Sequence, residues 1–263
     1  MSSFFSKQII FVLVFILIAV GAIFVLPKKA ETPTTIKEVK TEDATIKGTG
    51  DFTIEQIPIE NIPKAPSLDR PVYFNANLSE EVKKILTDRI SADIAMLKKN
   101  IGDIETWILL GADYKAAGDY GGARLAWEYA NAIRPANYVS FSNLGDLCHF
   151  YLKDYPCAEK NLLISIKNEP AYIAGYRALY DLYALSYKEK FSEAPKILLK
   201  GLAVNPKSVD LMILLAQYYR DTGDKGNALL YYDKAIALLT TAGDTARLEA
   251  VKSDRTALIP LTP

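Results

Sequence analysis

The sequence predicts an all-α fold in which a solenoid of helical hairpins follows one transmembrane helix and a flexible linker. The transmembrane helix is predicted by an uncharged apolar run of 18 residues near the N-terminus. The linker is predicted by the prolines and the missing helical periodicity of residues 28–77. The solenoid is predicted by a two-helix pattern at residues 104–137, of which weaker copies follow up to residue 242.

Charge and residue counts exclude several classes of site. Lys plus Arg and Asp plus Glu both total 31, so the chain lacks the basic surplus of a general nucleic-acid binder and we expect no nucleic-acid partner. Two cysteines without CxxC spacing and a single histidine are too few for the common metal sites. We therefore expect no metal and no cofactor.

The apolar run, IIFVLVFILIAVGAIFVL, occupies residues 9–26. As a helix it would be about 27 Å long, close to the hydrocarbon thickness of a bilayer. A cleaved signal peptide is the alternative, but the run exceeds a typical signal-peptide core and Val25-Leu26-Pro27-Lys28 lacks the small residues of a cleavage site. We expect residues 1–27 to form an uncleaved single-pass membrane anchor.

The orientation of this anchor depends on two opposing arguments. Only Lys7 and the amino terminus precede the run, whereas four lysines come after it, at positions 28, 29, 37 and 40. The positive-inside count alone would place the C-terminal part in the cytoplasm. An apolar segment so close to the start commonly behaves as a signal anchor that exports the downstream chain, and we favour an extracytoplasmic location for the array.

Residues 28–77 are predicted to be disordered up to Gly50 and extended beyond it, where prolines alternate with apolar side chains. Two interpretations stay open for the second half. It is either a partly ordered linker or a segment whose apolar residues lie against the helical domain or a partner. If Tyr73 and Phe74 dock on the first helix, they serve as an N-terminal cap of the array.

The first helix is predicted at residues 79–99. Ser79 is a suitable N-cap, and Glu80 and Glu81 place acidic side chains in the first turn. Apolar residues from Val82 to Leu97 fall at spacings of three and four, which predicts one apolar face.

Residues 104–137 contain the pattern that recurs downstream. Trp107, Leu110, Gly111 and Tyr114 have the W-x2-L-G-x2-Y spacing, and the second half continues with Ala123, Trp127, Ala130 and Pro135. This stretch resembles a tetratricopeptide repeat, in which two antiparallel helices approach at small residues and large residues fill the space beside them. Weaker copies follow near residues 138–172, 173–208 and 209–242, and a more polar helix is predicted at residues 244–258, where it would close the array.

The weaker copies depart from the pattern at particular positions. Cys148 replaces a Tyr in the second copy, which also has one residue inserted in its turn. Tyr180 replaces the small Gly in the third copy, whose turn is about two residues longer, and a bulky residue there should splay the hairpin or shift its register.

No catalytic constellation is recognisable, and we expect the protein not to be an enzyme. Cys148 and His149 are adjacent on a helix and point about 100° apart, so they do not form a hydrogen-bonded pair. A disulfide between Cys148 and Cys157 stays open, because it requires the two α-carbons to lie within about 7 Å. The Gly-rich turn at residues 118–122 lacks the Gly-Lys-Ser/Thr of a phosphate-binding loop.

The resemblance implies a partner-binding groove, since the first helices of successive tetratricopeptide hairpins line a concave surface that commonly receives a peptide or a partner helix. By the repeat register, the side chains that face it include Ile108, Ala112, Lys115, Ser142, Asp146, His149, Arg177, Asp181, Gln217 and Arg220, of which the eight from Lys115 onward are the candidate partner contacts. One subclass holds a peptide carboxylate with a clamp of Lys, Asn and Arg. Only Asn143 fits that clamp here, so chaperone-tail recognition of this kind is not expected.

Anchor, spacer and repeat array together predict a membrane-anchored scaffold that binds a protein or peptide partner. Two alternatives are a structural envelope protein whose arrays self-assemble end to end, and a non-catalytic subunit of a cell-envelope enzyme. The identity of the partner and the oligomeric state do not follow from the residues.

Overall fold

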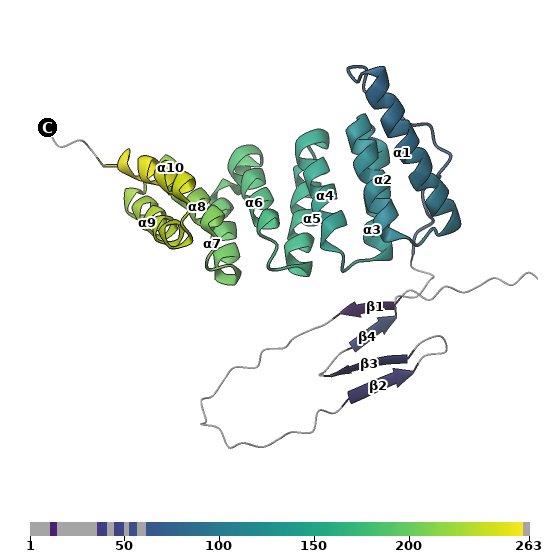
Figure 1. The fold of residues 1–263 in the computed structure, drawn as a ribbon, viewed down its shortest axis with the longest axis horizontal. Helices are drawn as coiled ribbons and strands as arrows, with labels where there is room; N and C mark the ends of the chain where they lie inside the picture. The colour runs from purple at the N-terminus through teal and green to yellow at the C-terminus, as the bar shows by residue number, and fades with distance from the viewer. Residues whose placement is uncertain (1–10, 15–35, 41–44, 50–52, 57–61, 260–263) are drawn as a thin grey trace, which may run out of the picture. The chain divides into compact units, whose positions relative to one another are not determined.

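The computed structural model describes residues 11–14, 36–40, 45–49, 53–56 and 62–259 (Figure 1). The chain divides into two compact units, residues 1–64 and residues 65–263. In the first unit, strand β1 (Phe11–Val14) pairs antiparallel with β4 (Thr53–Gln56). Strand β2 (Ile36–Lys40) pairs antiparallel with β3 (Thr45–Thr49), with Val39 opposite Ile46 in register.

This first unit differs from the sequence prediction. Of the predicted anchor at residues 9–26, only Phe11–Val14 are described, and they form a strand rather than a turn of helix. The rest of the anchor lies outside the described residues, and no helix in the described ranges is both long and apolar enough to cross a bilayer. Residues 36–40 and 45–49, predicted to be disordered, are strands, because their Ile, Val and Thr residues favour extended backbone.

The second unit confirms the predicted all-α array of hairpins (Figure 1). Helices α2 and α3, α4 and α5, α6 and α7, and α8 and α9 form four successive hairpins, with α1 before them and α10 after them. The helices are α1 (Glu80–Lys99), α2 (Ile104–Ala117), α3 (Tyr120–Ile133), α4 (Tyr138–Asp146), α5 (Tyr155–Asn168), α6 (Ile173–Asp181), α7 (Ala194–Val204), α8 (Val209–Asp221), α9 (Lys225–Ala242) and α10 (Thr245–Thr256).

The first hairpin packs as its signature residues predict. A Cβ added to Gly111 would lie 2.4 Å from Nε1 of Trp127, so only glycine lets α2 and α3 approach this closely. Trp107 and Trp127 are each 1% exposed. Their indole N–H groups donate to the carbonyls of Ile101 at 2.8 Å and of Ile108 at 3.1 Å, so neither buried ring leaves a polar group unpaired.

The middle hairpins contain π-helical segments that the sequence did not predict. Helix α4 continues into η2 (Leu147–Leu152) and α6 into η3 (Leu182–Ser186), and a 3-10 segment, η4 (Lys188–Glu193), precedes α7. Tyr180 is not the sole cause of these π-helical segments, because η2 lies in the second copy, which keeps the small Gly145. Both copies have extra residues in the turn, and a π-helical turn accommodates an inserted residue within a helix.

A strap of residues 65–78, which runs into α1, lies against α2 and α3. Arg70 donates two hydrogen bonds to the carboxylate of Asp119, at 2.6 and 3.1 Å, and its guanidinium lies 5.1 Å from the centre of the Tyr114 ring. The backbone N–H of Tyr73 also donates to Asp119, and that of Asn75 to the carbonyl of Ala117 at 2.7 Å. Residues 65–78 therefore dock on the array, which is one of the two arrangements that the sequence allows.

The docking residues are not those that the sequence suggested. The side chain of Tyr73 is 63% exposed, so the proposed cap of Tyr73 and Phe74 on the first helix is wrong for Tyr73. Arg70 reaches Asp119 instead, and Pro66 and Leu68 line a small hollow with Trp107 and Tyr114. The strap docks through the Arg70–Asp119 ion pair rather than through the Tyr73 side chain, because the carboxylate of Asp119, which is 5% exposed, requires a partner for its charge.

The opposite end of the array is closed by α10. Its Val251 completes a buried cluster with residues of α8 and α9, among them Met212, Tyr232 and Leu239. Arg255 forms an ion pair with Asp233 of α9 on the exposed side. Leu248 of the same helix also packs against this cluster, so α10 covers the last hairpin with apolar side chains and has a polar outer surface, as a solenoid end requires.

An acidic pair lies between α1 and α2. Asp113 is 3% exposed and is held by Arg89 at 2.6 Å, whereas Oδ2 of Asp93 is buried and has no hydrogen-bond partner within the described residues. Burial, and then the charge of Asp113, raise the pKa of Asp93 to about 6. The ionised form of Asp93 therefore opposes the packing of α1 on α2.

We expect Asp93→Asn to stabilise the array at pH 7.5 and to change little at pH 4.5. The folded state binds the proton of Asp93 more tightly than the unfolded chain does. Stability is therefore lost as the pH rises from about 4 through about 6. After allowance for partial exposure, the gain should be about 1–2 kcal/mol. Urea unfolding of parent and variant fragments beginning at residue 62, at both pH values, measures it. An equal gain at both pH values would contradict the assignment to charge.

Candidate partner-binding groove

A cleft of about 410 Å³ opens between the first helices of hairpins one and two. Helix α2 contributes Lys115, α4 contributes Asn143 and η2 contributes Tyr151. The complete lining is Ala112, Lys115, Ala116, Tyr120, Trp127, Asn143 and Tyr151. Two small residues, an amide, an ammonium group and aromatic rings therefore surround one opening, and Ala112 and Lys115 are the groove-facing residues of the repeat register that lie in its lining.

Lys115 and Asp146, both predicted groove residues, form an ion pair that joins α2 to α4. The ammonium group of Lys115 also lies 4.9 Å from the centre of the Tyr151 ring, which packs on Tyr120 with ring centres 4.8 Å apart. Both charged side chains remain partly exposed, at 28% and 37%. The pair is thus positioned by its neighbours and still reachable from outside.

Ser142 and His149 have other environments. The hydroxyl of Ser142 lies 3.4 Å from that of Tyr172, the residue just before α6. His149 is 1% exposed, so its prediction as a groove contact is wrong. Its Nε2 shares a hydrogen bond of 2.8 Å with Ser186 in η3, and burial lowers its pKa. The π-helical turn of η2 carries His149 away from the helical register that the prediction assumed.

A second polar group extends along α6, α8 and α10. Arg177 lies 3.9 Å from Asp210, which also pairs with Arg247. The Arg177 side chain is 52% exposed, as its predicted place in the groove requires. Asp181, one turn further on α6, is half-buried, and burial raises its pKa while Arg177 opposes that rise. Helices α6, α8 and α10 therefore present two guanidinium groups around the Asp210 carboxylate.

Gln217 and Arg220 complete the predicted set. Gln217 is half-buried on α8. Arg220 donates to Asp221 at 2.8 Å and to the hydroxyl of Tyr232 at 3.4 Å. Its guanidinium is thus engaged by α8 and α9, and it is not brought together with Lys115 and Asp146.

Sequence reasoning missed Tyr151, Tyr120, Asp210 and Arg247 as groove residues. Tyr120 and Tyr151 flank hairpin turns, which the first-helix register does not cover. Asp210 and Arg247 lie in the first turns of α8 and α10, and their opposite charges were a sequence signal for an ion pair between these helices.

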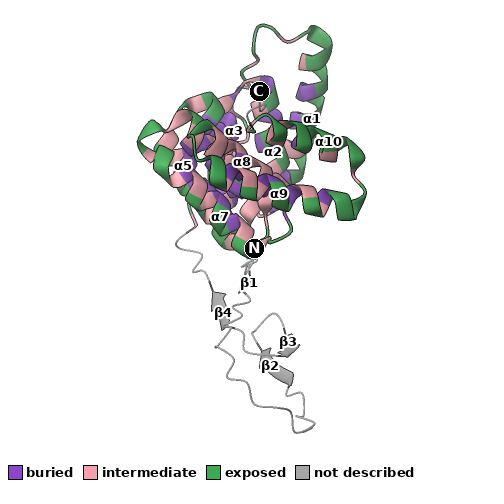
Figure 2. Ribbon diagram, turned by 90° about the vertical axis from the view of Figure 1, so that its left-hand side faces the viewer, coloured by how far each residue is buried: buried purple, intermediate pink, exposed green. Residues whose placement is uncertain are grey.

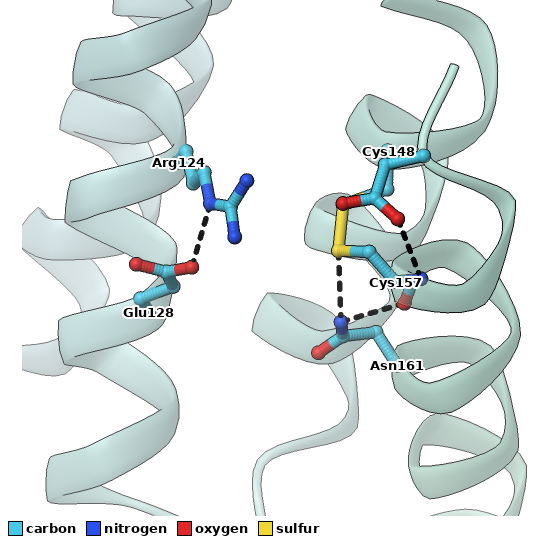
Figure 3. The surroundings of a disulfide bond; sticks show 6 residues. Arg124, Glu128, Cys148, Cys157 and Asn161 are labelled. Carbon is cyan, nitrogen blue, oxygen red and sulfur yellow. Dashed lines mark hydrogen bonds and ion pairs between the residues drawn. A yellow bond between two sulfur atoms is a disulfide. The ribbon is translucent and has the colours of Figure 1, made fainter. Parts of the chain in front are cut away.

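The structure forms the Cys148–Cys157 disulfide that the sequence left open. The two α-carbons are 5.8 Å apart, and the bond joins η2 to α5 within one hairpin (Figure 3). Asn161 supports it by donating to the Cys157 carbonyl at 2.8 Å and to Sγ at 3.5 Å. Within the described residues no group of three or more His, Cys, Asp or Glu side chains is arranged to hold a metal ion.

We expect reduction of this disulfide, or the double substitution Cys148→Ser with Cys157→Ser, to cost about 2–3 kcal/mol, because the bond closes a short loop in the unfolded chain. Thermal unfolding with and without reductant measures the loss in the parent. The double variant, which has no thiol, should not respond to reductant. Two free thiols in protein purified without reductant would contradict the disulfide.

Comparison with known proteins identifies the fold through solved structures of low sequence identity. No family model matches the sequence, and no curated protein matches it. A crystal structure of MamA superposes with a TM-score of 0.52 at 18% identity, covering 66% of this chain and 99% of that one. A second structure of MamA gives 0.51 at 19% identity, covering 70% and 92%. Together with the Gly111–Trp127 contact, this likeness shows that the helical array has the tetratricopeptide-type fold.

Proposed function

We propose that the protein is a membrane-anchored interaction module that binds a protein or peptide partner along the first helices of its hairpins. The cleft around Lys115, Asn143 and Tyr151 is the observation that carries this proposal. Because some of its lining residues are small, the backbone and the aromatic rings of the cleft are accessible to a partner. Its amide and charged groups can form hydrogen bonds or ion pairs with the main chain or side chains of an extended segment. The proposal assigns no catalytic activity to the chain.

The charges along the groove favour a partner of mixed character. Lys115 and Asp146 neutralise each other at one end, so a partner must supply both a donor and an acceptor to replace that pair. Around Asp210, the guanidinium groups of Arg177 and Arg247 are balanced by the carboxylates of Asp210 and of Asp244, which lies 4.0 Å from Arg247. We propose that the bound segment carries both hydrogen-bond donors and acceptors near α6 and α10 and neutral or aromatic groups near α2.

The apolar run of residues 9–26 supports the proposal of a membrane anchor. The Cys148–Cys157 disulfide supports an extracytoplasmic location for the array, because disulfides persist in oxidising compartments and are rare in the cytosol. A maleimide that does not cross membranes, applied to intact cells with a single cysteine introduced at exposed Lys153, tests the orientation. Labelling only after the membrane is opened would contradict it.

Photo-crosslinking in living cells tests the groove. A photoreactive residue placed at exposed Ala112 in the cleft should trap a protein of defined mass, whereas the same residue at exposed Leu230 on α9 should not. The same defined product at both positions, or none at Ala112 in folded protein, would overturn the proposal.

Substitutions in the cleft give a quantitative expectation. Tyr151→Ala or Lys115→Ala should reduce capture of that product at least about tenfold, since a few central residues usually supply most of the binding energy. Lys153→Ala, which removes an exposed lysine outside the cleft lining, is the matched control and should leave capture unchanged. Unchanged capture in both cleft variants would place the partner elsewhere.

A further inference from the structure

Helix α1 has a second apolar stripe that the array does not cover. Its inner side buries Leu86, Ile90 and Leu97. On another side, Val82, Ile85 and Met96 are 39%, 50% and 51% exposed. Much of α1 has the colour of exposed residues in Figure 2. The outer stripe, defined as residues 82, 85, 89, 92 and 96, has alternating spacings of three and four. This is the spacing of a seam between two packed helices.

The one charged residue in the outer stripe does not interrupt it. Arg89 directs its guanidinium to Asp113 on α2, at 2.6 Å, so its charge is compensated within the chain. Its methylene stem remains on the helix surface between Ile85 and Ala92, where it can contribute apolar contact. The stripe therefore presents a continuous surface from one end of α1 to the other.

Two charged side chains beside the stripe form no ion pair with another described residue. Glu81 and Lys99 lie on the same flank of α1, at its first and last turns, and neither is in an ion pair there. Their neighbours differ in this respect, since Glu80 pairs with Lys83 and Lys98 pairs with Asp69. An acidic flank at one end and a basic flank at the other are complementary to a second α1 that runs in the opposite direction.

The apolar and charged positions specify antiparallel alignments whose centres nearly coincide. In a pair centred near residue 89, Val82 lies opposite Met96 of the other copy and Ile85 lies opposite Ala92. A pair centred at residue 90 places Glu81 opposite Lys99. We infer that the outer stripe of α1 is a self-association surface on which two copies of this chain pack with their α1 helices antiparallel. The two-fold symmetry makes every contact occur twice.

Disulfide trapping in the full chain, held in membranes or detergent, tests this arrangement. Val82→Cys and Met96→Cys chains should each give no covalent dimer alone under mild oxidation, and should give one when the two are mixed. Leu230→Cys, at an equally exposed apolar position on α9, measures random collision. Dimers from each variant alone would show parallel packing. No dimer above the Leu230→Cys background in the mixture would show that another molecule, or no molecule, covers the stripe. Either result overturns the inference.

Charge reversal gives an independent readout. Glu81→Lys and Lys99→Glu should each weaken association, most at low salt, and the double variant should restore it. Ile85→Asp should raise the dissociation constant at least about tenfold, whereas Leu230→Asp should not. Failure of the double variant to restore association would exclude the antiparallel alignment. Partner capture through the cleft does not involve α1, so each proposal can fail without the other.

Discussion

Trp107→Ala should destabilise the array by about 3–5 kcal/mol, the cost of a large cavity in a well-packed core. The side chain is 1% exposed, its indole N–H donates to Ile101, and its ring centre lies 4.8 Å from that of Tyr129. Truncation therefore removes packing on α3 and leaves the Ile101 carbonyl without its donor. Urea unfolding of the fragment beginning at residue 62 measures the loss.

The matched comparison separates folding from partner binding. Arg177→Ala and Asp181→Asn change predicted groove residues whose side chains are exposed or half-buried. We expect both to remain within about 0.5 kcal/mol of the parent in unfolding while they weaken partner capture. A loss of folding as large as that of Trp107→Ala would mean that these residues serve packing rather than recognition.

Asp119→Ala should detach the strap and cost about 2–4 kcal/mol, because it leaves the Arg70 guanidinium without its partner and removes a helix N-cap. The carboxylate accepts from Arg70, from the Tyr73 N–H at 3.1 Å and from the Gly122 N–H at 2.9 Å. The lower end of the range allows for the 26% exposure of Arg70. Faster hydrogen exchange at Tyr73 and Asn75 would report the detachment directly.

The contribution of Asp119 also has a defined pH dependence. Burial disfavours its ionised form, but the hydrogen bonds from Arg70, Tyr73 and Gly122 outweigh burial and lower its pKa. Strap docking should therefore be complete above about pH 4 and should weaken as the pH falls further. Asp69→Ala, which removes only the exposed pair with Lys98, is the control and should cost less than about 0.5 kcal/mol. Equal effects of Asp69→Ala and Asp119→Ala would contradict the role of burial.

The local packing of the array could be predicted because its determinants are close in sequence. Gly111 and Trp127 are sixteen residues apart and belong to one hairpin, so the spacing of small and large residues already states which positions meet. The capping residues are equally local: Asp103, Asp119, Asn137, Asp154, Ser208, Asp224 and Asp244 each accept from the backbone N–H three residues later.

The groove could be predicted only in part. Lys115 and Asp146 were both placed on it by the repeat register, but their pairing depends on how α4 lies against α2. His149 was placed there by a register that the π-helical turn of η2 changes. A turn insertion was visible in the sequence, yet whether it lengthens the loop or enters the helix depends on the packing around it.

The sequence by itself determined the repeat: four hairpins, their small close-approach residues, their caps and a polar closing helix all follow from periodicities within about thirty-five residues. Only the tertiary structure decided which side chains from different elements share a site. It paired Arg70 with Asp119 across 49 positions, joined Cys148 to Cys157 and left one stripe of α1 uncovered. The reason is that a repeat pattern specifies contacts between neighbouring turns, whereas docking of the strap and exposure of α1 depend on which elements lie at the ends of the array.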